Sequence, residues 1–550
     1  MQKADPRNIL QSFTMLRFAV LFSLGIIIGD ALQPAITLPT WLYTLLALLA
    51  VAVLCRRRYE DIGNIALMLI FICLGSLRLC FSSAPPTATD RNASNAARHH
   101  TMTCRMAVLS EPVRHGRVLR FDALACDGTA IGGTRFRVSL LCDSTESISH
   151  PIHLADGLQA TAVLSSLETA ADSTSHFDYA RWLRCRGFSH MAFVPRDCWE
   201  HCDISKRDIG ICEWTLLRLS HFRARLLQQL RATGISGDTF AVASAMALGD
   251  RTAVTQALRE EYSMSGASHI LALSGMHLTV VYFLLSLLFR RRRSDYNIIR
   301  LGIIWAYVVF TGMPISLVRA ACMLTIYDAT LILGRTTDRL NSIGLAATVL
   351  LIANPLSLWD IGFEMSFAAV VSITLFCGRL DALMPKRYTY CYNTDALHIQ
   401  PSVIKRNRMV WLLWRMGSLS LAAQIGTVPL AAYYFGRVPL LSIVTSYVVV
   451  PCAFIVVAIT LATCLVIAMQ IGAEAITAAG GIISNILDAL VWCGAQLLSG
   501  VTWLLNTVVS AVAHLPFACI DNVNITLPQM LLMYVIILSV SLLVRVKNEE

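Results

Sequence analysis

The stretch Leu248-Gly249-Asp250-Arg251, followed by Ser265-Gly266-Ala267-Ser268-His269 and by Leu273-Ser274-Gly275-Met276-His277, decides how this chain is interpreted. It places ionisable, hydroxyl and glycine residues inside a region that is otherwise apolar enough for a membrane. Such residues are costly in hydrocarbon, so they collect there only where they face water, a cavity or a protein partner. Gly266 and Gly275 weaken a helix and predict breaks in it. The stretch therefore predicts a polar path through a helical membrane bundle.

The spacing of the polar residues suggests how they share this path. Ser265 and His269 are one helical turn apart, and His269 and His277 lie about 80° apart around a helix, so both imidazoles are expected at one cavity. Asp250, Arg251 and Ser274 are assigned to the same path. Three other interpretations stay open: hydrogen bonds between helices, a metal site, and Ser274 as a nucleophile. The histidine spacing matches no known metal motif, and Ser274 lacks the Gly-x-Ser-x-Gly elbow of esterases.

The composition supports a membrane protein. Of the 550 residues, 56% are hydrophobic and 15% are charged, whereas a soluble chain carries about 25% charged residues. Hydropathy predicts about ten to twelve membrane segments, some of them broken, tilted or interfacial. The apolar segments are 14–34, 40–55, 62–81, 263–289, 298–313, 315–334, 340–354, 362–377, 411–435, 440–470, 478–512 and 528–544.

Basic residues predict the orientation of these segments. The net charge is +10, and Lys and Arg cluster at 56–58, 290–293, 335–339 and 386–408. With both termini in the cytoplasm, all four clusters lie inside, as the positive-inside rule requires, and Arg437 is the exception. We read the clusters as topology signals rather than DNA contacts, and no cleaved signal peptide is evident. The prediction is a multi-pass protein of the cytoplasmic (inner) membrane, with residues 82–213 on the outer side.

Residues 82–213 interrupt the hydropathy pattern and predict a small β-domain. Alternating segments and turns such as Gly132-Gly133 indicate five short strands and one small helix, which suit an OB-like barrel, although a generic β-domain fits as well. The strands are expected at 106–113, 118–125, 134–141, 158–167 and 191–195. Seven cysteines on the oxidising side predict at least one disulfide, with zinc at Cys198, His201 and Cys202 as the alternative.

A short aromatic and basic element lies near the end of this domain. Phe177-Asp178-Tyr179-Ala180-Arg181-Trp182-Leu183 is followed by Arg186-Gly187-Phe188, which predicts a helix, a glycine stop and a last strand. Tyr179, Arg181, Trp182 and Arg186 can stack bases and hold phosphates. Alternatively, the aromatic residues pack the barrel onto the membrane. An amphipathic helix at 214–234 follows and is predicted to lie in the membrane interface.

Ionisable residues recur later in the apolar part of the chain. Arg319 lies within an apolar helix, and Asp360 and Glu364 stand near the start of another span. Arg319 needs an anion or water in this setting. A structural ion pair with either acid and a place in a pore are both open.

These motifs together resemble the ComEC competence family over roughly residues 100 to 470. The resemblance rests on the blocks quoted above, on Gln424-Ile425-Gly426-Thr427-Val428-Pro429-Leu430, and on Val449-Val450-Pro451, whose prolines suggest broken spans. Glu364 departs from the family, where a Gln is common at this position. The resemblance implies a channel for single-stranded DNA, with Gln424 also on the path, and the domains are 1–81, 82–213, 214–234 and 235–550.

The resemblance also implies partners. These are single-stranded DNA, the lipid bilayer, a DNA receptor, a cytoplasmic ATP-driven motor and a separate nuclease, and a homo-oligomer is allowed. The family's metallo-β-lactamase-like domain has no counterpart motif here, and no P-loop is present, so we expect no enzyme activity, no cofactor and no metal. Two alternatives remain: a transporter of another anionic polymer or small solute, and a membrane scaffold that transports nothing.

Overall fold

The computed structural model divides the chain into two compact units. The first comprises Met1–Arg223 and Cys322–Asp360, and the second comprises Ala224–Ala321 and Ile361–Glu550. The structure describes residues 13–32, 38–55, 59–82, 101–126, 132–142, 152–167, 178–196, 198–288, 294–333, 338–384, 401–476 and 482–549. Phe177 and the basic clusters at 56–58 and 290–293 lie outside the described residues, as do Arg335 and most of 386–408.

Apolar helices packed through small residues form the membrane part of the first unit. Its helices are α2 (Thr14–Leu32), α3 (Leu38–Cys55), α4 (Glu60–Ser82), α14 (Arg339–Ala353) and the 3-10 turn η3 (Pro355–Trp359). A side chain at Gly25 would overlap the backbone of Ile72, and Ser76 Oγ donates to the carbonyl of Gly25 at 2.6 Å. Small residues therefore let α2 and α4 approach closely, as they do in other membrane bundles.

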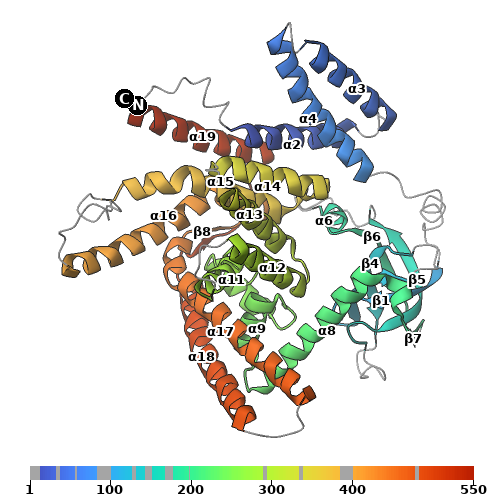
Figure 1. The fold of residues 1–550 in the computed structure, drawn as a ribbon. Coiled ribbons are helices and arrows are strands. Elements are labelled where there is room, and N and C mark those ends of the chain that lie inside the picture. Colours follow the sequence, from blue (N-terminus) through green and yellow to red (C-terminus); the bar gives the residue numbers. More distant parts are fainter. Residues whose placement is uncertain are drawn as a thin grey trace. The chain divides into compact units, whose positions relative to one another are not determined.

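A small closed barrel forms the other part of the first unit (Figure 1). Its strands are β1 (Thr101–Val108), β2 (Val113–His115), β3 (Val118–Ala125), β4 (Arg135–Leu141), β5 (Gly157–Ser166), β6 (Phe188–Val194) and β7 (Trp199–Cys202). The strand order β1-β3-β4-β6-β5 closes on itself because β5 also pairs with β1. The pair β4–β6 is parallel and the other pairs are antiparallel.

The alternation expected along 134–141 positions the barrel core. Phe136, Val138 and Leu140 are buried, whereas Arg135, Arg137 and Ser139 lie on the outer face. A helix, α6 (Tyr179–Cys185), joins β5 to β6 and ends before Gly187, which has a φ of 80°. This order and closure are those of the OB-like barrel that the sequence predicts. The structure differs from the expected strand at 106–113, because β1 covers Thr101–Val108, and β2 and β7 have no counterpart among the expected strands.

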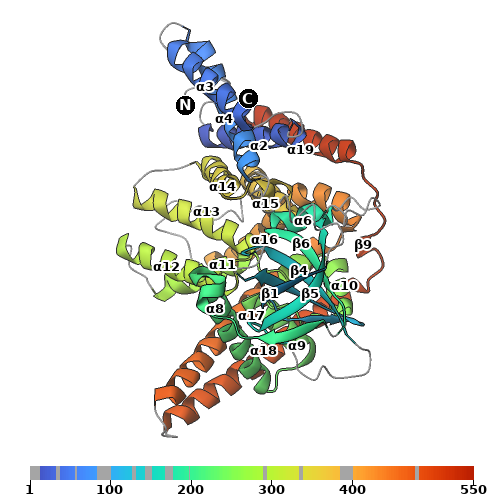
Figure 2. The same ribbon diagram turned by 90° about the vertical axis from the view of Figure 1, so that its right-hand side faces the viewer.

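The second unit is a helical bundle (Figures 1 and 2). It contains α9 (Gly237–Leu248), α10 (Gln256–Met264), η2 (Ser268–Ile270), α11 (Gly275–Leu288), α12 (Ser294–Phe310), α15 (Ile361–Ala382), α16 (Pro401–Phe435), α17 (Ser442–Ile476), α18 (Ile482–Ala513) and α19 (Leu527–Glu549). α7 (Lys206–Ile209) belongs to the first unit, and both α8 (Ile211–Ala232) and α13 (Ile315–Ile332) contribute to both units.

Among the described residues, six helices are long and apolar enough to cross a membrane, and five shorter apolar helices accompany them. The six are Thr14–Leu32, Leu38–Cys55, Asp61–Ser82, Ile361–Ala382, Ser442–Gly472 and Asn485–Ala513. Four of the shorter helices correspond to the predicted segments 263–289, 298–313, 340–354 and 528–544, whereas Gly237–Leu248 corresponds to none of the predicted segments. The fold class predicted from the sequence, a polytopic helical membrane protein with a small barrel, is therefore confirmed.

Two expectations about helix breaks are wrong. α16 continues through Pro429, and α17 continues through Pro451. Each proline removes one backbone hydrogen bond, but packing on both sides holds the helix. At α16 this packing is tight, since Gly426 lies against the backbone of Ala368, Ser372 Oγ donates to the carbonyl of Ala422 at 2.6 Å, and Tyr534 donates to that of Gly426.

Arg437, the residue that departs from the positive-inside pattern, is held by acidic residues. Its guanidinium pairs with Asp521 at 3.0 Å and approaches Glu260 at 3.7 Å. Beside it, β8 (Val438–Pro439) pairs with β9 (Cys519–Ile520) and joins two interhelical turns. Arg437 is therefore part of a network of ion pairs at these turns.

The expected disulfide is also wrong. All seven cysteines of the insert are free thiols: Cys104, Cys126, Cys142, Cys185, Cys198, Cys202 and Cys212. Cys104, Cys126 and Cys185 are buried and act as small apolar residues. Burial raises the pKa of Cys104 to about 11, with the neighbouring Cys126 adding to the shift. Burial likewise raises the pKa of Cys185 to about 12.

Candidate functional site

The motif around Gly266 forms a non-helical break in the bundle. α10 ends at Met264, and only the short turn η2 interrupts the irregular chain before α11 begins at Gly275. Both predicted breaks are thus confirmed. The argument from helical spacing is wrong, because Ser265, His269 and His277 do not share one helix. Ser265 is buried and donates to the carbonyl of Tyr262, while His269 is exposed and its Nδ1 lies 3.1 Å from the carbonyl of Gly266.

Gly266 is required by both conformation and contact. Its φ of 77° lies in the left-handed region, and a Cβ there would overlap Ser442 and lie 3.0 Å from the Cβ of Pro439. Glycine avoids both penalties. The break is therefore fixed against the start of α17.

Ser274 and His277 cap the helix that follows the break. His277 is fully buried, and its Nδ1 accepts from the backbone N–H of Ser274 at 3.0 Å and lies 3.0 Å from Ser274 Oγ. This arrangement is half of a capping box, with His in the place of the usual Glu or Gln. Because Nδ1 accepts a bond from an N–H, the neutral ring carries its proton on Nε2. Nε2 has no hydrogen-bond partner among the residues that the structure describes.

The Leu248–Arg251 motif ends α9. Gly249 adopts the left-handed conformation with a φ of 76°, and a Cβ there would meet Leu273 of the break at 2.5 Å. Asp250 is held in a turn, where its carboxylate accepts from the backbone N–H and the hydroxyl of Thr252. Arg251 is exposed. The motif therefore packs against the break, as the sequence suggests.

Arg319 lies on a helix that contacts the break. Ser316 Oγ donates to the carbonyl of Leu273, and the Cβ of Ala320 is 3.3 Å from where a Cβ of Gly275 would stand. Arg319 itself is 3% exposed, and its guanidinium lies 6.0 Å from the ring centroid of Phe363. A cation is thus buried beside the non-helical backbone. Such a group in a membrane bundle is a functional candidate by default.

The two acids that the sequence offers as partners of Arg319 belong to different units. Glu364 is in the second unit, where its Oε2 accepts from the hydroxyl of Tyr434 at 3.0 Å. Asp360 is 6% exposed and belongs to the first unit, where its charge acts on Cys185 and Arg186 of the barrel helix. The predicted ion pair between Arg319 and either acid stays a prediction.

Gln424 belongs to a polar ladder between α16 and α17. Its Nε2 donates to Ser420 Oγ at 3.3 Å, and Ser420 Oγ donates to Ser446 Oγ at 3.2 Å. Ser446 in turn donates to the carbonyl of Ser442, whose Cβ would lie 2.3 Å from a Cβ added at Gly266. The ladder therefore connects Gln424 to the break through hydroxyl groups.

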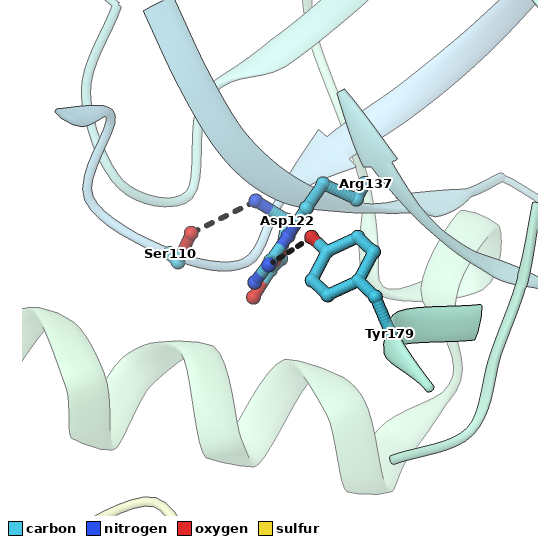
Figure 3. Close-up of polar contacts among 4 residues, drawn as sticks. All are labelled: Ser110, Asp122, Arg137 and Tyr179. Carbon is cyan, nitrogen blue, oxygen red and sulfur yellow. Dashed lines mark hydrogen bonds and ion pairs between the residues drawn. The ribbon is translucent and has the colours of Figure 1, made fainter. Parts of the chain in front are cut away.

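A second candidate site lies on the barrel and centres on α6. Tyr179 stacks on Trp182 with centroids 5.6 Å apart, and Arg186 lies 3.9 Å over the Trp182 ring. Arg137 of β4 donates to the Tyr179 hydroxyl at 3.0 Å, a contact that Figure 3 shows, and to Asp122 of β3 at 2.9 Å. We call Arg137, Tyr179, Trp182, Arg186 and Phe188 the barrel cluster. In OB-folds the face of the second and third strands and the neighbouring loops bind oligonucleotides, and β3, β4 and α6 occupy those positions here.

The structure separates Arg181 from this cluster. Tyr179, Trp182 and Arg186 lie on one side of α6, whereas Arg181 pairs with Asp30 of α2 and lies 3.9 Å over the ring of Trp359 in η3. Near it, Asn354 donates to the carbonyl of Cys185 at 2.9 Å. Arg181 is therefore a docking residue within the first unit, and its role in receiving DNA stays a prediction.

Arg137 is the residue that the sequence reasoning missed. The sequence does show which side of its strand Arg137 occupies, because the alternation along β4 places it on the outer face. The missing information was that β4 lies beside α6, since these segments are about 40 residues apart and meet only through the closed barrel.

These features define a class: a polytopic helical membrane protein that carries a closed β-barrel and a polar break in its bundle. A family model described as Competence protein matches residues 246–547, which include the break, and the chain belongs to this family. The chain is also similar to ComE operon protein 3 of Bacillus subtilis (strain 168), with 27% identity over 217 residues. That alignment covers 39% of this chain and 25% of the relative. No solved structure matches the chain.

Proposed function

We propose that this protein is a channel that passes single-stranded DNA across the cytoplasmic membrane into the cell during natural transformation. Membership of the competence family supports a role in competence and DNA uptake. The finer assignment rests on one observation: a buried arginine adjoins a non-helical break in an apolar bundle, within the segment that the family model matches.

The break supplies groups that a passing polyanion needs. Irregular backbone at membrane depth is tolerated only where it is buried in protein or lines water. Arg319 offsets phosphate charge, and the Ser274, His277 and Gln424 groups supply hydrogen-bonding atoms near the path. A strand that moves must be held weakly at several places, so a path with one buried cation and several neutral polar groups suits translocation.

The barrel cluster is the proposed receiving surface. Its aromatic rings offer faces for bases, and Arg137 and Arg186 offer charge for phosphates, the combination by which OB-folds hold single strands without reading sequence. We assign energy, the DNA receptor and processing of the other strand to separate partners, and no catalytic role to this chain.

Uptake of labelled DNA tests the proposal. A strain lacking the protein should accumulate labelled DNA outside the cytoplasmic membrane and none in the cytoplasm, and the wild-type gene should restore entry. Normal cytoplasmic DNA in the deletion strain would make the channel assignment wrong and favour a transporter of another anion or a scaffold.

Arg319 separates a pore role from a structural one. Arg319→Ala should abolish cytoplasmic DNA at normal protein level, whereas Arg259→Ala, at an exposed position on α10, should not. If Arg319 only pairs with a buried acid, its loss destabilises the protein by about 3–5 kcal/mol. Arg319→Ala combined with Glu364→Gln would then restore both protein level and DNA entry, and that result would contradict the pore role.

A further inference from the structure

The outer face of the barrel continues past the barrel cluster as one more row of side chains. Successive residues of a strand point to opposite faces, so Ser139 lies on the outer face of β4 together with Arg137. Ser139 pairs with Arg120 of β3 and with Phe193 of β6, and both of these residues are exposed between buried neighbours. Arg120, Ser139 and Phe193 therefore form a row across three strands, which we call the outer row.

The outer row adjoins the barrel cluster within the first unit. Met191 is two residues before Phe193 on β6, pairs with Arg137, and belongs to the same hydrophobic cluster as Trp182. Two residues along a strand span about 7 Å, and two strand spacings span about 10 Å. The outer row is thus one step of about 7 Å from the barrel cluster, and the Cα atoms of Arg120 and Phe193 lie about 10 Å apart across it.

Arg120 supplies the outer row with a positive charge. The strands β3, β4 and β6 hold a single acidic residue, Asp122, and it pairs with Arg137 at 2.9 Å. A second arginine of β4, Arg135, pairs with Glu213 at 2.5 Å. Arg120 is exposed and has no acidic partner among the residues that the structure describes. The outer row therefore favours an anionic ligand.

Phe193 supplies the outer row with an aromatic ring. It is 43% exposed, and within the described part of the chain its ring contacts no other aromatic ring and no cation. Nonspecific single-strand sites combine cations that follow the phosphates with aromatic rings on which bases stack. A duplex covers its base faces by stacking, and a lipid headgroup has no flat ring, so neither of them uses both groups of the row.

We propose that the outer row binds the next nucleotide beyond the barrel cluster on a single strand of DNA, an inference that rests on the proposed function. Arg120 contacts the phosphate, Phe193 stacks on the base, and the Ser139 hydroxyl between them adds a hydrogen bond. Both phenylalanines, Phe188 and Phe193, stand on β6, whereas Arg137 and Arg120 stand on β4 and β3. The DNA strand therefore lies along the barrel with its bases toward β6 and its phosphates toward β3.

Binding of a fluorescein-labelled oligothymidylate to the full-length protein tests the outer row. The protein is held in nanodiscs of phosphatidylcholine, and fluorescence anisotropy is measured over a series of salt concentrations. Arg120→Gln removes one phosphate contact, so the steepness of log K against log salt should fall by about 0.7, and Arg120→Lys should keep the wild-type slope. Phe193→Ala should weaken binding by about 5- to 150-fold, and Phe193→Tyr should not.

Two further variants separate stacking and local charge from other causes. Phe193→Leu keeps an apolar side chain without a ring face, so it should weaken binding as Phe193→Ala does. Arg207→Gln removes an exposed cation of α7, outside the outer row, and should keep the wild-type slope.

Three results would overturn the outer row. The first is no binding by the wild-type protein at low salt. The second is wild-type binding by Phe193→Ala or Arg120→Gln while Trp182→Ala binds weakly, which would confine the DNA to the barrel cluster. The third is full binding by Phe193→Leu, or an effect of Arg120→Gln confined to nanodiscs containing phosphatidylglycerol, which would assign the row to an apolar or lipid contact. Dependence of cytoplasmic DNA entry on the protein would persist in each of these cases if the channel function is right.

Discussion

Replacing Gly266 with alanine should break the packing of the motif. The φ of 77° costs a residue with a side chain about 1–2 kcal/mol. The added Cβ would overlap Ser442 and lie 3.0 Å from Pro439, and overpacking of this kind costs about 1–3 kcal/mol. The two effects together predict a loss of about 2–5 kcal/mol, a large part of the stability of a typical protein.

The assay is thermal unfolding of purified protein in detergent, followed by size-exclusion chromatography. Gly302→Ala is the control, because Gly302 lies inside α12 with no atom within 4 Å of its would-be Cβ, so it should gain about 0.5–1 kcal/mol. Adding Ser442→Gly to Gly266→Ala should remove the overlap with Ser442, recovering part of the steric cost and leaving the contact with Pro439 and the conformational cost. A Gly266→Ala protein that melts with the wild type would show that the break is not fixed as described.

Three further outcomes follow from the contacts. His277→Gln should keep the bond to the N–H of Ser274, whereas His277→Leu should lose it and melt lower, by about 1–2 kcal/mol; equal melting of the two variants would argue against the cap. At pH 8 a membrane-impermeant maleimide applied to intact spheroplasts should label the exposed Cys198 but not the buried Cys104. The pKa of Cys104, about 11, leaves about one thiol in a thousand as thiolate. Labelling of Cys198 only after permeabilisation would reverse the predicted topology. Arg181→Ala should loosen the barrel from α2 by about 1–2 kcal/mol, seen as faster proteolysis of the barrel, and should leave oligonucleotide affinity unchanged.

Several elements could be predicted because their signal is local. Alternation along β4 marks a strand with one buried face, and apolar runs mark α2, α4 and α17. Gly266 and Gly275 mark the break, because glycine weakens a helix wherever it stands. These signals depend on neighbours within a few residues, which the sequence shows directly.

Other features were decided by contacts between distant segments. Arg181 and Asp30 are 151 positions apart, and nothing near Arg181 in the sequence distinguishes docking from DNA binding. Arg137 reaches Tyr179 only because the barrel closes through the parallel pair β4–β6. Pro429 stays within α16 because the packing around it outweighs one lost hydrogen bond.

The sequence by itself thus determined the class of the fold, the place of the break and the amphipathic character of α8. Only the tertiary structure decided which side of α6 contributes to the barrel cluster and which side contacts α2 and η3. It also decided that the cysteines of the insert are free and that protein covers the apolar side of α8. The physical reason is that periodicity encodes a residue's side of its own element, whereas the partner on that side is chosen by packing between elements far apart in the chain.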